Sequence, residues 1–281
     1  MKKVVWIALI VVLLGGAGAF VAYRISMRTL SEQPHPLPSA QSQLSQQAAQ
    51  TQPQVMPREE SFDEPLRKMV ADLGVSEFSG GNNPEHSEVR CYIYSNFMVK
   101  ELDLKQLGDE WISIAPVSAS NPPPCAQEHG DNEIVIKYPD WTGYFAGVKG
   151  NLVFLNAEDG FNGGYPFGVF DAATGKKLFE DSRELGKEEK LRFVSDGKGS
   201  VLRYQRIDVE ECSIPLKKSE CWEEVMRKTG LKYQPMPVCA GYGNNIDQND
   251  HSVVSYPVEV TLQPGFERRL LSGPVKCWPE D

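Results

Sequence analysis

The residues that decide the fold class run from 144 to 156 and read YFAGVKGNLVFLN. Two runs of aromatic and branched side chains, at residues 144–148 and 152–156, flank the dipeptide Lys149-Gly150. This arrangement predicts a β-hairpin, because glycine readily adopts the backbone conformation that a tight turn requires. The same pattern around residues 173–176 predicts a second hairpin.

Short runs of the same kind recur along the chain and are separated by Gly, Asn, Asp or Pro. They predict further strands at residues 89–97, 111–117, 134–138, 167–170, 191–194, 201–207 and 253–262. Apolar residues at helical spacing predict two short helices, one over residues 61–73 and one over residues 220–229, each followed by glycine. The sequence therefore predicts a mainly β fold, an antiparallel sandwich or barrel, with two short helices.

A propeller-like arrangement of hairpins is an alternative form of this fold. Residues 167–179 resemble the outer hairpin of a β-propeller blade. The pattern occurs once, however, and no second copy follows at a period of 40 to 50 residues, which a propeller would require.

The first 23 residues are typical of an export segment. Residues 1–3 carry Lys2 and Lys3 and form a short cytoplasmic region, and the apolar run at residues 4–23 is long enough to cross a bilayer as a helix. A cleaved signal peptide, cut after Ala19, is the alternative interpretation. The apolar run continues to Tyr23, which favours an uncleaved transmembrane anchor.

The next segment, residues 24–57, is rich in Pro and Gln and almost uncharged after Arg28. Such a composition predicts a disordered spacer, because it offers too little apolar surface to fold. The remaining residues, 58–281, form the predicted exported domain and carry 25 basic against 37 acidic side chains, a net charge of −12. An acidic surface repels phosphate, so nucleic acid is not an expected partner.

Six cysteines all lie in the predicted exported domain. An even number of cysteines outside the cytosol predicts disulfides. Pairing in chain order is preferred among the fifteen arrangements, and it joins Cys91 with Cys125, Cys212 with Cys221, and Cys239 with Cys277. No CxxC pair is present, so neither a thioredoxin-like motif nor a zinc ribbon is expected.

Candidate metal or catalytic residues are few. His129 lies in the polar stretch 128–133, which lacks the HExxH spacing and is interpreted as a solvated loop. Asn245, Asp247 and Asn249 alternate as in a calcium loop, but the glycine and the final glutamate of that loop are missing. No catalytic metal, cofactor or nucleophile motif is recognised, so no cofactor is expected.

Aromatic side chains crowd the glycine-rich stretch from Tyr138 to Phe170. Alternation along strands places about two-thirds of them in the core. Trp141 and Tyr165 each stand beside a turn residue and are the predicted binding residues.

These patterns favour a membrane-tethered envelope protein, with a single-pass helix in the inner membrane and its C-terminal domain in the periplasm or outside. The expected partner is another envelope protein or a glycan, and the domain is expected to have no chemistry of its own. The alternative function is an anchored hydrolase with a carboxylate or metal site. The alternative location is periplasmic or secreted, after cleavage.

Overall fold

The computed structural model describes residues 58–80, 84–118, 122–186, 190–195, 199–232, 234–242, 250–262 and 265–280. The predicted anchor at residues 4–23 and the predicted spacer lie outside this part, as does the calcium-like pattern at residues 245–249. Within the described ranges no helix has both the length and the apolar character that a membrane span needs.

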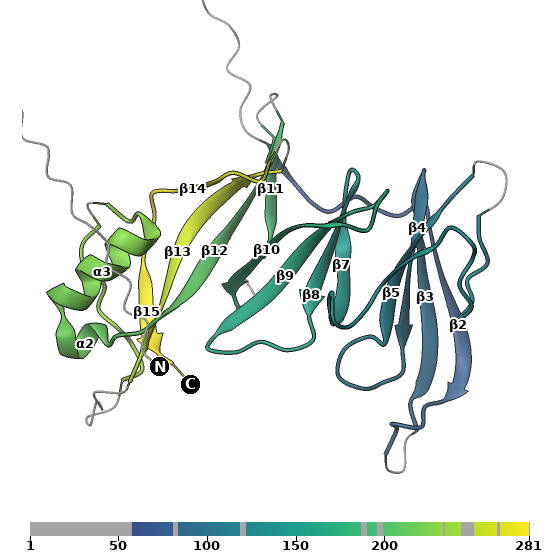
Figure 1. Cartoon of the computed structure of the whole chain (residues 1–281), viewed down its shortest axis with the longest axis horizontal. Helices are drawn as coiled ribbons and strands as arrows, with labels where there is room; N and C mark the ends of the chain where they lie inside the picture. Colours follow the sequence, from purple (N-terminus) through teal and green to yellow (C-terminus); the bar gives the residue numbers. More distant parts are fainter. Residues whose placement is uncertain are drawn as a thin grey trace, which may run out of the picture. The chain divides into compact units, whose positions relative to one another are not determined.

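The described residues form two antiparallel sheets (Figure 1). The small sheet has the strand order β2-β3-β4-β5-β6. Its strands are β2 (Arg67–Val75), β3 (His86–Ile93), β4 (Phe97–Asp103), β5 (Trp111–Pro116) and β6 (Ile134–Ile136).

The large sheet has the order β1-β11-β12-β10-β9-β8-β7, and β13 joins it by pairing with β12, β14 and β15. Its strands are β1 (Arg58–Glu60), β7 (Gly143–Lys149), β8 (Leu152–Ala157), β9 (Gly164–Asp171), β10 (Lys177–Glu184), β11 (Arg192–Ser195), β12 (Ser200–Glu210), β13 (Ser252–Thr261), β14 (Arg268–Leu270) and β15 (Lys276–Pro279). The prediction of a mainly β protein with antiparallel sheets is confirmed.

Both predicted hairpins form. The turn between β7 and β8 contains Gly150 at a φ of 61°, a value that glycine adopts without strain. In the turn between β9 and β10, Asp171 Oδ1 accepts hydrogen bonds from the backbone of Ala173 and Thr174 at 3.1 and 2.9 Å. This second hairpin lies within the large sheet between β8 and β12, so it is not a blade of a propeller.

The predicted helix over residues 61–73 is wrong, because this part of the chain contributes the strand β2. Met69 and Ala71 pack against one face of the small sheet, whereas Val70 between them is 63% exposed. This alternation has the period of a strand. Pairing with β3 along Arg67–Val75 outweighs the weak helical spacing, and Gly74 lies beside a shift in register rather than at a helix end.

The second predicted helix is confirmed as α3 (Ser219–Thr229). It buries Trp222 and Val225, and it ends at Gly230, whose N–H donates to Met226 O at 2.9 Å. A one-turn helix, α2 (Ile214–Lys217), precedes it and was not predicted from the sequence.

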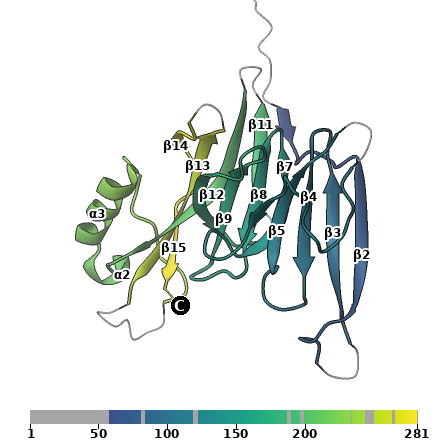
Figure 2. The same cartoon turned by 45° about the vertical axis from the view of Figure 1, so that its right-hand side comes forward.

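The two sheets pack face to face. Val99 and Ile114 of the small sheet share a hydrophobic cluster with Val153, Leu155 and Phe170 of the large sheet. Figures 1 and 2 both show β4 and β5 next to β7. The opposite face of the large sheet has its own core, which contains Trp222 and Val225 of α3.

The far face of the small sheet is covered by residues 122–133, which we call the covering segment. Cys125 of this segment packs with Cys91, Met98 and Trp111 and is joined to Cys91 by a disulfide. The other disulfides join Cys212 to Cys221 and Cys239 to Cys277. The predicted pairing in chain order is confirmed, and three disulfides are consistent with an oxidising, extracytoplasmic compartment.

Candidate functional site

The first candidate site is a groove around Trp141, which we call the aromatic groove. It has a volume of about 310 Å³ and lies where the connection between β6 and β7 meets β8, β9 and β10. Its lining consists of Tyr138, Pro139, Asp140, Trp141, Thr142, Ala157, Pro166, Lys177 and Glu180.

Trp141 is fixed in the wall of this groove rather than free in solvent. Its Nε1 donates to Asn156 O at 3.1 Å, and its ring meets Phe170 edge-on with centroids 6.0 Å apart. Gly168 makes room for the ring, because a Cβ at that position would lie 3.1 Å from it. The side chain is half-buried, and these contacts hold its ring in one place.

Tyr138 supplies the exposed aromatic surface of the groove, being 80% exposed. Lys177 Nζ lies 5.5 Å from the centre of the Trp141 ring and also pairs with Glu180 at 2.6 Å. This pair is internally neutral, which leaves Asp140 as the remaining formal charge of the lining. The groove thus combines a flat apolar ring with several hydrogen-bonding groups and little net charge.

Tyr165 does not join this groove. Along β9 it shares a face with Phe167 and Val169, whereas Pro166 lines the aromatic groove on the other face. The ring of Tyr165 lies 5.1 Å from the Arg183 guanidinium carbon and is half-buried. The structure therefore separates the two predicted binding residues across one sheet.

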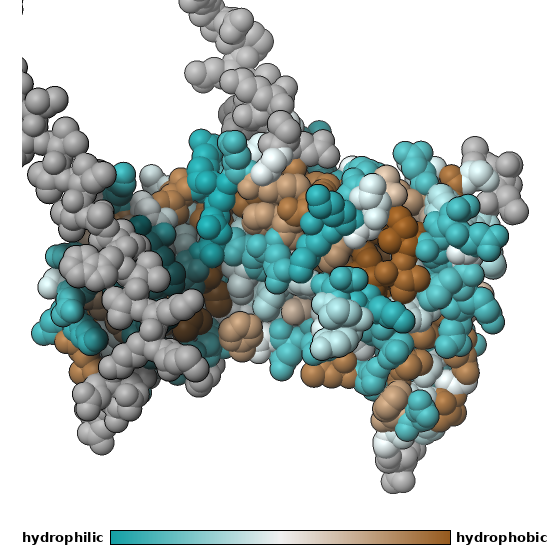
Figure 3. Space-filling model, viewed as in Figure 1, coloured by the Kyte–Doolittle hydropathy of each residue, from teal (hydrophilic) through white to brown (hydrophobic). Residues whose placement is uncertain are grey.

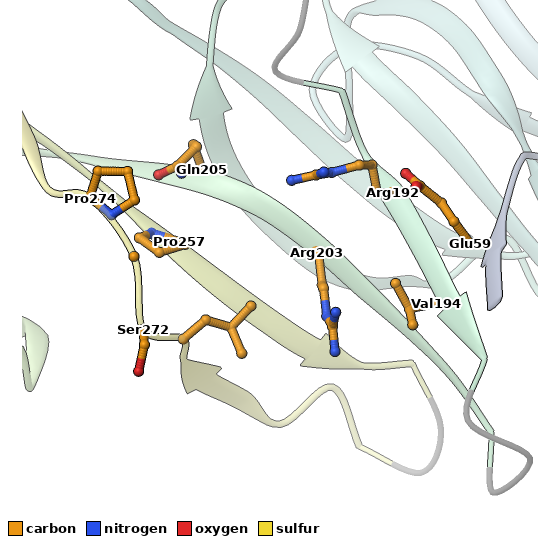
Figure 4. A pocket seen from close by; sticks show the side chains of 10 residues that line it. Glu59, Arg192, Val194, Arg203, Gln205, Pro257, Ser272 and Pro274 are labelled. Atoms are coloured by element: carbon orange, nitrogen blue, oxygen red, sulfur yellow. The ribbon is translucent and has the colours of Figure 1, made fainter. Parts of the chain in front are cut away.

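A second groove, the arginine groove, was not predicted from the sequence (Figure 4). It has a volume of about 310 Å³. Arg192 and Arg203 line it from the neighbouring strands β11 and β12, where they lie directly opposite each other. Like charges in this arrangement destabilise a sheet. Glu59 of β1 also lines the groove, and Arg203 donates from Nε to Glu259 at 2.7 Å.

Charged side chains also gather on the face of the small sheet that meets β7, in what we call the charge cluster. Arg90 lies at its centre, paired with Glu101 at 2.9 Å, Asp103 at 2.5 Å and Glu88 at 2.5 Å. Lys105 adds contacts to Asp103 at 2.7 Å and to Glu88 at 3.0 Å. The cluster compensates most of its own charge.

Asp109 lies beside this cluster and is only 7% exposed. Its two carboxylate oxygens are buried and accept no hydrogen bond from the described residues. Burial, together with the negative charges of Glu101 and Asp103, raises the pKa of Asp109 to about 8. The carboxyl group is therefore largely protonated at neutral pH.

The stretch around His129 is more than the solvated loop that its sequence suggests. Glu133 is 1% exposed at its side chain and binds Lys100 Nζ at 2.9 Å, and His129 Nδ1 lies 3.0 Å from the same carboxylate. Burial opposes ionisation of Glu133, but hydrogen bonds from Lys100, Ser113 and His129 lower its pKa to about 2. These contacts fasten the covering segment to β4 and β5, which is a structural role.

Metal-binding geometry is not found in the described part of the chain, where no three His, Cys, Asp or Glu side chains are grouped to hold an ion.

Comparison with known proteins found no relative, since no family model, curated protein or solved structure matches the chain.

Proposed function

We propose that the chain is an extracytoplasmic binding protein of the cell envelope, without chemistry of its own. In this proposal residues 4–23 anchor it in the inner membrane as a single span, residues 24–57 act as a spacer, and the domain that follows recognises a glycan or protein component. The disulfides support a location outside the reducing cytosol. The aromatic groove is the observation that carries the binding role.

A glycan is the favoured ligand class, because the chemistry of the groove suits a neutral sugar. The exposed Tyr138 ring offers an apolar platform, and Asp140 and Thr142 offer hydrogen-bonding groups beside it. The Lys177 and Glu180 pair leaves little net charge to attract an ionic ligand. Trp141, held against Phe170, keeps the wall of the groove rigid, which lowers the ordering cost of binding.

The test measures binding of the full-length protein to cell-wall glycan prepared from its host. Tyr138→Ala removes the exposed platform and should weaken binding roughly 5- to 30-fold, the equivalent of about 1–2 kcal/mol of buried aromatic surface. Phe161→Ala is the matched control, since this ring is also exposed at 60% but lines neither groove. Unchanged glycan binding by Tyr138→Ala would show that the aromatic groove is not the binding site.

The same variants separate a protein ligand from a glycan. Crosslinking in intact envelopes, followed by mass spectrometry, identifies the neighbours of the wild-type chain. Loss of one protein neighbour in Tyr138→Ala, with no glycan bound by the wild type, would identify that protein as the ligand.

The anchored hydrolase is the second candidate function, and the specific observation that favours it is the protonated carboxyl group of Asp109 beside Glu101. A carboxylic acid with a raised pKa can serve as a general acid. Against this role, Glu101 is 3% exposed and Asp109 is nearly as buried, and neither residue lines either groove. Binding without chemistry therefore remains the stronger proposal.

A further inference from the structure

The strand β2 forms one edge of the small sheet. It pairs with β3 on one side, and no described strand pairs with its other side. An edge strand of this kind presents unpaired backbone N–H and C=O groups, which can be completed by a strand from another chain. Figure 1 shows β2 at the outer end of the small sheet.

Exposed apolar side chains gather on and beside this edge. The exposed large hydrophobic residues of the region are Leu66, Val70, Leu73, Val75 and Phe78. In Figure 3, brown hydrophobic patches alternate with teal hydrophilic ones on the side where Figure 1 places the small sheet. Apolar side chains exposed beside an open strand favour pairing of this edge with a strand of another chain.

The charges on β2 indicate which strand could pair with it. Lys68, Val70 and Asp72 lie opposite Tyr92, Arg90 and Glu88 of β3, so the three side chains share one face of the sheet. Hydrogen bonds from the Gly74 amide and from His86 lower the pKa of Asp72, which keeps it ionised. Along this face, β2 therefore carries a positive, then an apolar, and then a negative side chain.

That order is complementary to itself in an antiparallel arrangement. If Val70 of two copies meets on a two-fold axis, Lys68 of each copy lies opposite Asp72 of the other, and the two valines face each other. Moving the axis by one residue, to Met69 or Ala71, places a charged side chain opposite Val70. Moving it to Lys68 places like charges opposite each other, which is unfavourable.

We propose that two copies of this chain associate through β2, in antiparallel register with Val70 on the two-fold axis. The pairing register of β2 with β3 is regular from Arg67 to Asp72 and shifts only between Asp72 and Gly74, so Lys68 to Asp72 form an undistorted ladder. The contact is isologous and occupies the β2 edge of both copies, so it closes as a dimer rather than growing into a fibre.

Cysteine crosslinking of the full-length protein tests the register. Directly opposite residues have Cβ atoms about 4.5–5.5 Å apart, close to the range of a disulfide, so Val70→Cys should give a covalent dimer under mild oxidation. Val75→Cys is the matched control, since Val75 is 62% exposed and Val70 is 63% exposed. In the proposed register the two copies of position 75 lie more than about 25 Å apart, so this variant should form no disulfide between the copies.

Charge exchange tests the same register without a new thiol. Lys68→Glu or Asp72→Lys alone should weaken the dimer roughly tenfold in sedimentation, because each places like charges opposite each other at two sites. The double variant Lys68→Glu with Asp72→Lys should restore the wild-type dimer within about threefold. Equal crosslinking at positions 70 and 75, no 70-to-70 disulfide in peptide maps, or a double variant as weak as the single ones would each overturn the proposal.

Discussion

At the scale of single residues, Asp109 couples the stability of the fold to pH. In an unfolded chain an aspartate has a pKa of about 3.9. In the folded protein, burial is the main cause that raises the pKa of Asp109 to about 8, and the negative charges of Glu101 and Asp103 add to it. Between these two values the folded state holds the proton more firmly than the unfolded state does, so the free energy of unfolding falls as the pH rises from about 4 to 8.

Asp109→Asn keeps the shape of the side chain and removes its charge. We expect thermal unfolding at pH 9 to show a melting temperature at least about 4 °C above the wild type, with little difference at pH 4. Asp140→Asn changes an exposed carboxylate and serves as the control at both pH values. A stabilisation of equal size at pH 4 and pH 9 would show that ionisation of Asp109 is not the cause.

The candidate site could be read from the sequence only in part. The crowding of aromatic residues singled out Trp141 as a binding residue, which stays a prediction, and Trp141 lies in the wall of the aromatic groove. Lys177 and Glu180 line the same groove because the hairpin of β9 and β10 brings them there. The arginine groove depends on the register that places Arg192 opposite Arg203. Neither register nor burial can be read from neighbouring residues alone.

At the scale of elements, the hairpins were predictable because local turn chemistry specifies them. Strand β2 was not, since its apolar residues fit a helix as well as a strand and only the pairing with β3 decides between them. Strand β4 was missed because Lys100, Glu101 and Asp103 break the apolar pattern, although the whole strand is buried. Their charges are compensated by Arg90 of the neighbouring strand β3 and by Glu133, which follows β5 in the chain.

Two of the disulfides hold different elements, so the effects of removing each one on stability can be compared. Cys91–Cys125 holds the segment that covers the small sheet, and Cys212–Cys221 joins the end of β12 to α3. Their sequence separations are 34 and 9 residues. Loss of the first disulfide should therefore lower the free energy of unfolding by about 4 kcal/mol, and loss of the second by about 3 kcal/mol.

Hydrogen exchange of the two double alanine variants should locate these effects. The variant without Cys91–Cys125 should lose protection in residues 122–133 and keep it in α3, and the variant without Cys212–Cys221 should show the reverse. Equal loss of protection throughout the domain in both variants would show that the elements do not open separately.

At the scale of the whole molecule, the disulfides set the redox requirement. All six cysteines are paired, and there is no free cysteine in the described residues. Protein taken from its native compartment and denatured without reductant should therefore add no alkylating reagent, as measured by intact mass. The labelling of two or more thiols would place the chain in a reducing compartment and remove one support of the proposed location.

The position of strand β1 determines which contacts in the described part of the chain would break first under a pulling force. Among the described strands, Arg58 to Glu60 pair with β11 alone, at the edge of the large sheet, and Lys149 bonds to Glu60 at 2.9 Å and to Asp63 at 3.2 Å. Phe62 then packs its ring against Phe154 and Phe193, with centroids 5.3 and 5.0 Å apart. A pull from the N-terminal side would therefore meet these noncovalent contacts first and the covalent crosslinks only later, so tension would detach the first strand while the crosslinked remainder stayed folded.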